Sequence, residues 1–219
     1  MIHTLAEFFR EGGPFMYINL LFLTVALAIV TERVITILFK LDINAGAFMA
    51  QVQKLILSNN IDRAIKLCSA APNAALSRVV RAGLARANRG QREIARALEE
   101  TVIEVTPLVS RRIPSLWSMA NIATLVGLIG TIVGLIGTFK SLGAASPEMK
   151  QLMLSKGISE AMNNTAFGLI IAVTCIIAHL LLTNKSKALI EEIEFHAMRL
   201  ESMLTQRASG ETNPLERTA

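Results

Sequence analysis

The stretch LVGLIGTIVGLIGTFKSL, residues 125–142, combines an apolar composition with regularly spaced glycines. Glycine in a helix interior costs roughly 0.8–1 kcal/mol relative to alanine, so four glycines in one helix need a reason. On a helix that advances about 100° per residue, seven small or hydroxyl-bearing residues share about a third of the circumference. These are Gly127, Gly130, Thr131, Gly134, Gly137, Thr138 and Ser141. Leu, Ile and Val cover the opposite side, so the stretch predicts an apolar helix with one smooth, faintly polar face.

The whole chain has the composition of a membrane protein. Its 219 residues are 52% hydrophobic and only 18% charged, and the mean hydropathy is +0.48. Three stretches lack any Asp, Glu, Lys or Arg: residues 12–31, 115–139 and 161–184. Each has about the 20 residues that a helix needs to cross a bilayer. We expect an all-α membrane protein with three transmembrane helices.

The three uncharged stretches have two other possible explanations. The first stretch could be a cleaved signal peptide, but Glu7 and Glu11 precede it where a signal peptide carries basic residues, and no cleavage site follows it. The other two could be buried core helices of a soluble protein, which the low charge of the chain disfavours. Cys68 and Cys175 fall in a cytoplasmic segment and a membrane span, so no disulfide framework is expected.

Basic residues predict the orientation of the three helices. They follow the first span, precede the second and follow the third. The cytoplasmic ends of membrane helices typically carry an excess of Lys and Arg. The N-terminus is therefore expected outside and the C-terminus inside, although a short outer loop with three lysines weakens the contrast. The basic residues are Arg33, Lys40, Arg111, Arg112, Lys185 and Lys187 at the inner ends, and Lys140, Lys150 and Lys156 in the outer loop.

The expected organisation has six segments. The cytoplasmic segment reads as amphipathic helices with breaks near residues 58–60, 71–73 and 88–90. Its arginines could form a nucleic-acid surface, but they lack interleaved aromatic residues, and retention of cytoplasmic loops explains them more simply. The segments are an outer tail with the first transmembrane helix (1–39), a cytoplasmic helical segment (40–113), the second transmembrane helix (114–142), a short periplasmic loop (143–157), the third transmembrane helix (158–184), and a cytoplasmic C-terminal helix with a disordered tail (185–219).

No group of residues with catalytic or metal-binding spacing stands out. His3, His179 and His196 are scattered, and no Ser/His/Asp set is found. The glycines of the opening stretch imitate nucleotide-binding motifs, but those need a preceding strand, or a glycine directly before the lysine, where Phe139 stands here. We therefore expect no enzymatic activity, no metal and no cofactor.

The third span carries a second stripe of small residues. Ala161, Thr165, Gly168, Ala172 and Cys175 recur at spacings of four and three, and Glu160 and Asn164 border them. One explanation is that the two stripes pack on each other, because small residues let membrane helices approach closely. The other is a functional polar surface, because a carboxylate at bilayer depth costs a few kcal/mol unless it faces water or a partner. The residues alone leave both explanations open.

These two stretches together resemble a known family. GLIGTIVGLIGTF at residues 127–139, followed after a short loop by GISEAMNNTAFGL at residues 157–169, is similar to the MotA/TolQ/ExbB proton-channel family, most closely to its ExbB and TolQ branch. The resemblance covers nearly the whole chain. It implies a ring of five copies in the bacterial inner membrane, around a dimer of a single-span ExbD/TolR-like partner whose membrane aspartate takes and releases a proton.

The resemblance also implies roles for individual residues. Thr131 and Thr165 match pore-lining threonines, and Glu160 matches the acidic residue at the outer end of the third span. We add Asn164 to this expected ion pathway. Asn163 and Asn164 replace residues that are more often apolar or small in the family, and this departure could allow sodium to be used in place of protons. A second departure is Ala172-Val173-Thr174, which stands where the family often has Ala-Ile-Pro. The residues expected to pack on the partner helix are Gly127, Gly130, Gly134, Gly137, Ala161, Gly168 and Ala172.

The sequence-based hypothesis is a ring-forming stator subunit that couples ion flow, with a proton as the expected ion, to movement of the partner. The alternative is a non-conducting membrane scaffold packed through its small-residue faces. Nutrient uptake, envelope maintenance and gliding all use subunits of this kind, and the sequence does not distinguish between them.

Overall fold

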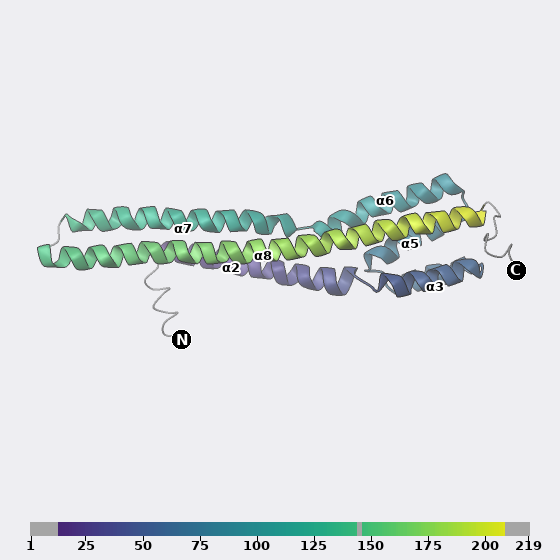
Figure 1. Cartoon of the computed structure of the whole chain (residues 1–219), viewed down its shortest axis with the longest axis horizontal. Helices are drawn as coiled ribbons and strands as arrows, with labels where there is room; N and C mark the ends of the chain where they lie inside the picture. Colours follow the sequence, from purple (N-terminus) through teal and green to yellow (C-terminus); the bar gives the residue numbers. More distant parts are fainter. Residues whose placement is uncertain (1–12, 144–145, 209–219) are drawn as a thin grey trace, which may run out of the picture. The chain divides into compact units, whose positions relative to one another are not determined.

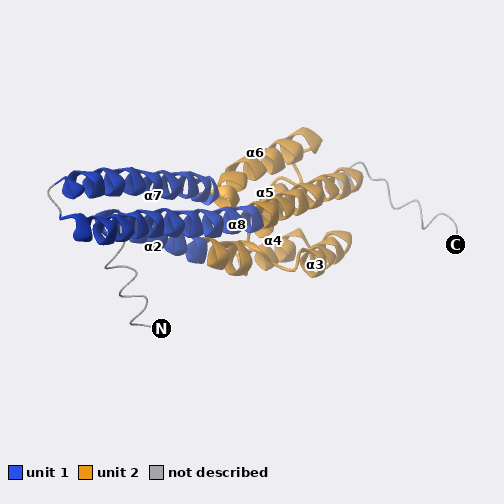
Figure 2. Cartoon of the chain, turned by 60° about the vertical axis from the view of Figure 1, so that its left-hand side comes forward, with its two compact units in different colours: residues 1–32, 112–182 blue, residues 33–111, 183–219 orange. Residues whose placement is uncertain are grey.

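The computed structural model describes residues 13–143 and 146–208, and these residues form helices without any strand. Three helical segments are long and apolar enough to cross a membrane: Gly13–Leu57, Gln91–Leu142 and Pro147–Arg207. The chain divides into two compact units, residues 1–32 with 112–182 and residues 33–111 with 183–219 (Figure 2). The predicted outer tail before residue 13 and the predicted disordered tail after residue 208 lie outside the described residues.

Unit 1 consists of three apolar helices side by side (Figure 1). They are α2 (Gly13–Ile35), α7 (Ile113–Leu142) and the first part of α8 (Pro147–Ala208). Pro14 and Pro114 lie in the first turns of α2 and α7, where a missing backbone N–H breaks no hydrogen bond. Much of the surface of α7 is apolar and exposed, including Leu125, Leu128, Ile132, Ile136 and Phe139. Such a face suits lipid or another copy of the chain.

The predicted loop over residues 143–157 is wrong, because α8 already begins at Pro147. Ser146, Pro147 and Glu148 together favour a helix start: the Ser146 carbonyl accepts hydrogen bonds from the amides of Met149 and Lys150, and Pro and Glu suit the first turn. The connection after α7 is correspondingly short. Glu160 therefore lies well inside α8 and not at its N-terminus.

Unit 2 holds the predicted series of short helices. They are the π-helix η1 (Thr36–Leu41), α3 (Ala45–Leu57), α4 (Ile61–Ser69), α5 (Ala75–Ala85) and α6 (Gln91–Ser110), together with the rest of α8. All three predicted breaks are confirmed. The Asn44 side chain caps α3 by accepting from the Ala47 amide at 3.0 Å. The core of this unit includes the fully buried side chains of Val52, Val79, Ile94 and Leu200.

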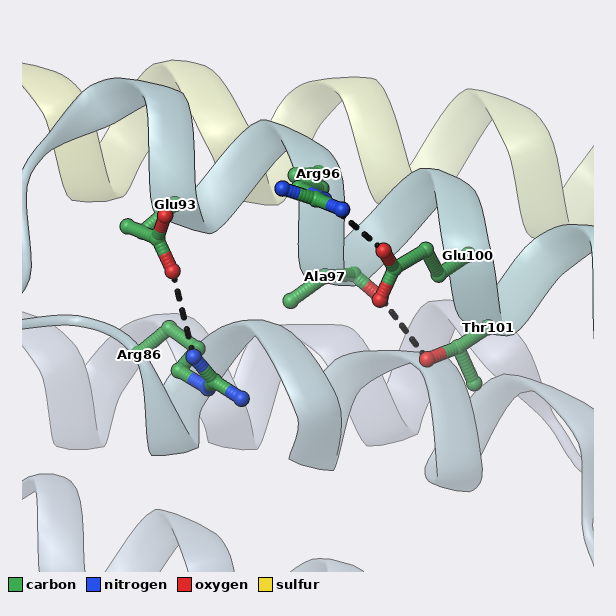
Figure 3. A network of polar contacts seen from close by, with 6 residues as sticks. All are labelled: Arg86, Glu93, Arg96, Ala97, Glu100 and Thr101. Carbon is green, nitrogen blue, oxygen red and sulfur yellow. Dashed lines mark hydrogen bonds and ion pairs between the residues drawn. The ribbon is translucent and has the colours of Figure 1, made fainter.

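Three arginines of unit 2 pair with glutamates. Arg86 meets Glu93 at 3.1 Å and Arg96 meets Glu100 at 2.8 Å (Figure 3). A third pair joins Arg78 to Glu104 at 2.9 Å. These pairs are substantially exposed, so each adds at most about 1 kcal/mol of stability. They lower the net positive charge of the surface that the arginines cover.

Cys68 provides a test of the packing of unit 2. Its side chain is 1% exposed on α4, and burial raises the pKa of the thiol from 9.0 to about 11, against smaller opposing effects of Ser77 and Arg81. Because the thiolate is the nucleophile, iodoacetamide at pH 8 should modify Cys68 more than tenfold more slowly in the native protein than in denaturant. The measurement uses a Cys175→Ser variant, so that only one thiol reacts. Equal rates with and without denaturant would contradict the buried position.

Candidate functional site

Two threonines of unit 1 meet across the contact of α7 and α8. The hydroxyl groups of Thr131 and Thr165 are hydrogen-bonded to each other. Both also lie 3.1 Å from the carbonyl oxygen of Gly127, and the Thr131 hydroxyl lies 3.3 Å from the carbonyl oxygen of Ala161. The two side chains are half-buried. Two hydroxyl hydrogens are thus shared among four oxygens, so the pair keeps free lone pairs with which it can accept a hydrogen bond from a carboxyl group or a water.

An open groove begins about one helical turn along α7 from Thr131, where Gly134 lines it. It has a volume of about 340 Å³ and runs between the C-terminal half of α7 and the early part of α8. Its wall is largely small or polar, and it includes one acid and one base, Glu160 and Lys156. A second hollow of about 320 Å³ shares these two residues. The residues lining the groove are Val133, Gly134, Gly137, Thr138, Ser141, Met153, Lys156, Gly157 and Glu160.

Glu160 lies beside the start of α2. A Cβ built on Gly13 would come within 2.7 Å of the Glu160 Oε1 atom, and Gly13 has φ +68°, a conformation that favours glycine. The positive end of the helix dipole that favours this carboxylate is therefore that of α2.

The glycine stripe of α7 divides into two parts. Gly127 and Gly130 are buried against α8: a Cβ on Gly127 would lie 3.2 Å from the Asn164 carbonyl oxygen, and one on Gly130 would overlap the Asn164 side chain. Gly134 is half-buried beside Ala161, and Gly137 has no other described residue within 4 Å of its Cβ position. For the first two glycines the contact is therefore the packing of two helices of the same chain. A partner helix on the remaining part of the stripe stays a prediction.

The stripe of α8 is turned into the unit. Ala161, Ala172 and Cys175 are at most 6% exposed, and Gly168 is buried. The closest approach is at Gly168, where a Cβ would lie 2.7 Å from the carbonyl oxygen of Ala123 and 3.2 Å from the Cα of Gly127. These positions match the alternative in which the stripes pack on each other, and they do not favour direct contact of these residues with a separate helix.

Asn164 lies among the helices of unit 1. Its side chain is 2% exposed and lies against Gly130, while the groove is lined by other residues. Its assignment to the ion pathway stays a prediction that this position does not favour. Of the expected pathway residues, the structure brings Thr131 and Thr165 together and places Glu160 in the neighbouring groove.

The sequence reasoning missed two residues near the site. Thr138 approaches Gly157 so closely that a Cβ on the glycine would overlap its side chain, which fixes the helices at the groove. Asn19 of α2 is fully buried, and a Cβ on Gly168 would lie 3.3 Å from its Nδ2 atom. The available signal for Asn19 was a single amide within an otherwise apolar stretch.

Comparison with known proteins agrees with this arrangement. Residues 71–195 match the family model of the MotA/TolQ/ExbB proton channel family. The matched range contains the threonine pair, the groove and the glycines that pack α7 on α8. No curated protein matches the sequence significantly.

Proposed function

The chain belongs to the MotA/TolQ/ExbB proton channel family, and on that basis we propose that it is the ring-forming subunit of an ion-driven motor in a bacterial inner membrane. In this proposal five copies surround two single-span helices of the ExbD/TolR kind, and ion flow moves those helices. The N-terminus lies outside and the C-terminus inside. The proposal includes no enzymatic step and no cofactor.

The observation that carries the proposal is the half-buried threonine pair, which lies about one helical turn from Gly134 of the groove. Glu160 attracts cations to the groove, and the hydroxyl groups of Thr131 and Thr165 can accept hydrogen bonds beyond it. Threonine hydroxyl groups neither take up nor release a proton near neutral pH, so this chain provides a passage and a docking point for a proton carrier. It does not itself provide the carrier.

The proton-binding group is assigned to the partner. Span two, residues 114–142, contains no acid, and Glu160 stands near one end of span three. An aspartate on a partner helix would meet the threonine pair, release its proton and turn away. One elementary charge crossing the membrane provides about 2.3 kcal/mol per 100 mV, so each step can drive only a modest movement and any leak wastes it.

The proposal is tested by proton flux into liposomes. The purified chain alone should conduct poorly, and flux should rise at least tenfold when a single-span partner with a membrane aspartate is reconstituted with it. The matched control is the same partner with Asp→Asn, which should give no increase. Rapid flux through the chain alone, or an increase that survives Asp→Asn, would contradict the assigned division of roles.

Glu160→Gln is expected to lower partner-dependent flux several-fold at low ionic strength and by less at 0.5 M salt, because salt screens the attraction of cations to the groove. The fold should be preserved, since the side chain is only half-buried. Glu148→Gln, in the exposed first turn of the same helix, is the matched control and should transport normally. Equal losses in both variants, or a loss independent of salt, would remove Glu160 from the ion entrance.

The scaffold function remains the second candidate because part of the small-residue surface is used within the chain. Gly127, Gly130 and Gly168 need no partner to explain them. Under this candidate, the chain assembles and spans the membrane, but neither co-purifies with a single-span Asp-bearing protein nor increases its flux. Co-purification of the two chains at a fixed ratio would exclude the scaffold function.

A further inference from the structure

Two amide side chains buried inside unit 1 have polar atoms without a hydrogen-bond partner in the described part of the chain. Asn19 of α2 is 0% exposed, and both its Oδ1 and Nδ2 atoms lack a hydrogen-bond partner among the described residues. Asn164 of α8 is 2% exposed, and its Oδ1 atom likewise has no partner within that part of the chain. A buried amide without a partner costs roughly 1–3 kcal/mol or more, so two of them in an apolar helix bundle require an occupant.

The two amides lie in successive layers of the bundle. The Asn164 side chain fills the space over Gly130, which also has the Phe15 Cβ atom 3.0 Å from its own Cβ position. The Asn19 amide fills the space over Gly168. Phe15 and Asn19 are one turn apart on α2, and Asn164 and Gly168 are one turn apart on α8. Along the helix axes the two amides are therefore offset by about one turn, a rise of roughly 5.4 Å, and one water that makes two hydrogen bonds of about 2.9 Å can span an offset of that size.

We propose that Asn19 and Asn164 form an internal water site, in which an ordered water molecule bridges α2 to α8. Gly130 leaves space for the Asn164 amide, because a Cβ there would overlap that side chain, and a Cβ on Gly168 would lie 3.3 Å from the Asn19 Nδ2 atom. This role for the glycines is separate from any partner helix and does not depend on the proposed motor function.

The chemistry of the amides favours water over a cation. Asn19 presents both an unpaired acceptor and an unpaired donor. This holds for either orientation of the amide, because exchanging its oxygen and nitrogen atoms still leaves one acceptor and one donor. A sodium ion would satisfy the oxygen atoms alone and be repelled by the N–H groups. Water both donates and accepts, and internal waters typically make about three hydrogen bonds to such groups. Because both residues are almost completely buried, a lipid headgroup cannot reach them.

A double-mutant cycle tests the coupling between the amides. Asn19→Leu and Asn164→Leu keep the side-chain size and should each lower the thermal midpoint of the purified protein, because each leaves the other amide without its bridge. The double variant should lose clearly less than the sum of the two shifts. Asn163→Leu, a half-buried neighbour on the same helix, is the matched control and should not lower the midpoint. Strictly additive shifts would overturn the proposal.

Two further measurements identify the occupant. The thermal midpoint should be the same in sodium and in potassium chloride. Stabilisation by sodium that Asn19→Leu abolishes would replace the water with a cation. A cryo-EM map of the assembled protein at a resolution that shows water should contain one density peak about 2.9 Å from both amides. A direct amide–amide hydrogen bond in that map, or no peak, would overturn the water site.

Discussion

Replacing Gly168 by alanine is expected to disrupt the packing of α7 on α8. The new methyl group would lie 2.7 Å from the Ala123 carbonyl oxygen and 3.2 Å from the Gly127 Cα atom. Both are backbone atoms, so the strain can be relieved only by moving a whole helix. Overpacking of this kind typically costs about 1–3 kcal/mol, and more where backbone must shift. The thermal midpoint of the purified protein should fall clearly, and part of the protein should aggregate.

Gly137→Ala is the matched control for this change. Gly137 belongs to the glycine stripe of α7, but no other described residue lies within 4 Å of its Cβ position. The midpoint should stay the same or rise slightly, because alanine favours a helix over glycine by roughly 0.8–1 kcal/mol. Equal destabilisation by the two substitutions would contradict the division of the glycine stripe into a packed part and an open part.

Gly137→Leu extends this control into a test of function. If a partner helix turns against the open part of the stripe, a large side chain there should reduce partner-dependent flux at least tenfold in a subunit that still folds. Normal flux would show that no partner packs at Gly137.

Thr131→Val and Thr165→Val are expected to abolish partner-dependent ion flux. Valine keeps the shape of threonine and removes the hydroxyl group, so the partner's carboxyl group loses its hydrogen bond beyond the groove. Each substitution also removes the bond between the two threonines, which should lower stability by only about 1 kcal/mol. The ring should therefore still assemble, and proton flux into liposomes should fall at least tenfold.

Two variants show whether the hydroxyl groups themselves matter. Thr131→Ser should retain much of the flux, because serine keeps the hydroxyl group that accepts the hydrogen bond. Thr124→Val is the matched control: this threonine is half-buried on the same helix and bonds only the carbonyl oxygen of Ala120 in the preceding turn at 3.0 Å. Full flux in both threonine-pair valine variants would leave the pair only a structural role, as a contact between α7 and α8.

The sequence allowed much of the helical fold to be predicted because its signals are local. Asn, Gly or Pro residues break the hydrophobic pattern near residues 58–60, 71–73 and 88–90, and the helices of unit 2 end at these same places. Pro14 and Pro114 mark helix starts for the same reason. The helix start at Pro147, inside the predicted loop over residues 143–157, also has a local signal, because Ser146-Pro147-Glu148 is a typical helix-start sequence.

The arrangement of the site was harder to predict. A helical projection places Gly127 and Gly137 on one face, but it does not say where along that face the next helix crosses. That crossing buries Gly127 and leaves Gly137 open. Asn19 was missed because one amide in an apolar stretch carries no pattern, and its importance depends on Asn164, which is distant in sequence and close in space.

The helices α7 and α8 are fastened to each other at three successive heights: Gly127 on Gly168, Thr131 on Thr165, and Thr138 on Gly157. A hairpin clamped in this way has little freedom to splay, and α8 continues through Ala172-Val173-Thr174 without a proline hinge. If the chain assembles into the proposed ring, the α7–α8 pair of unit 1 would behave as a rigid element in each copy. Adjustment to a turning partner helix would then occur at contacts between copies, for which the exposed Leu and Ile side chains of α7 are available.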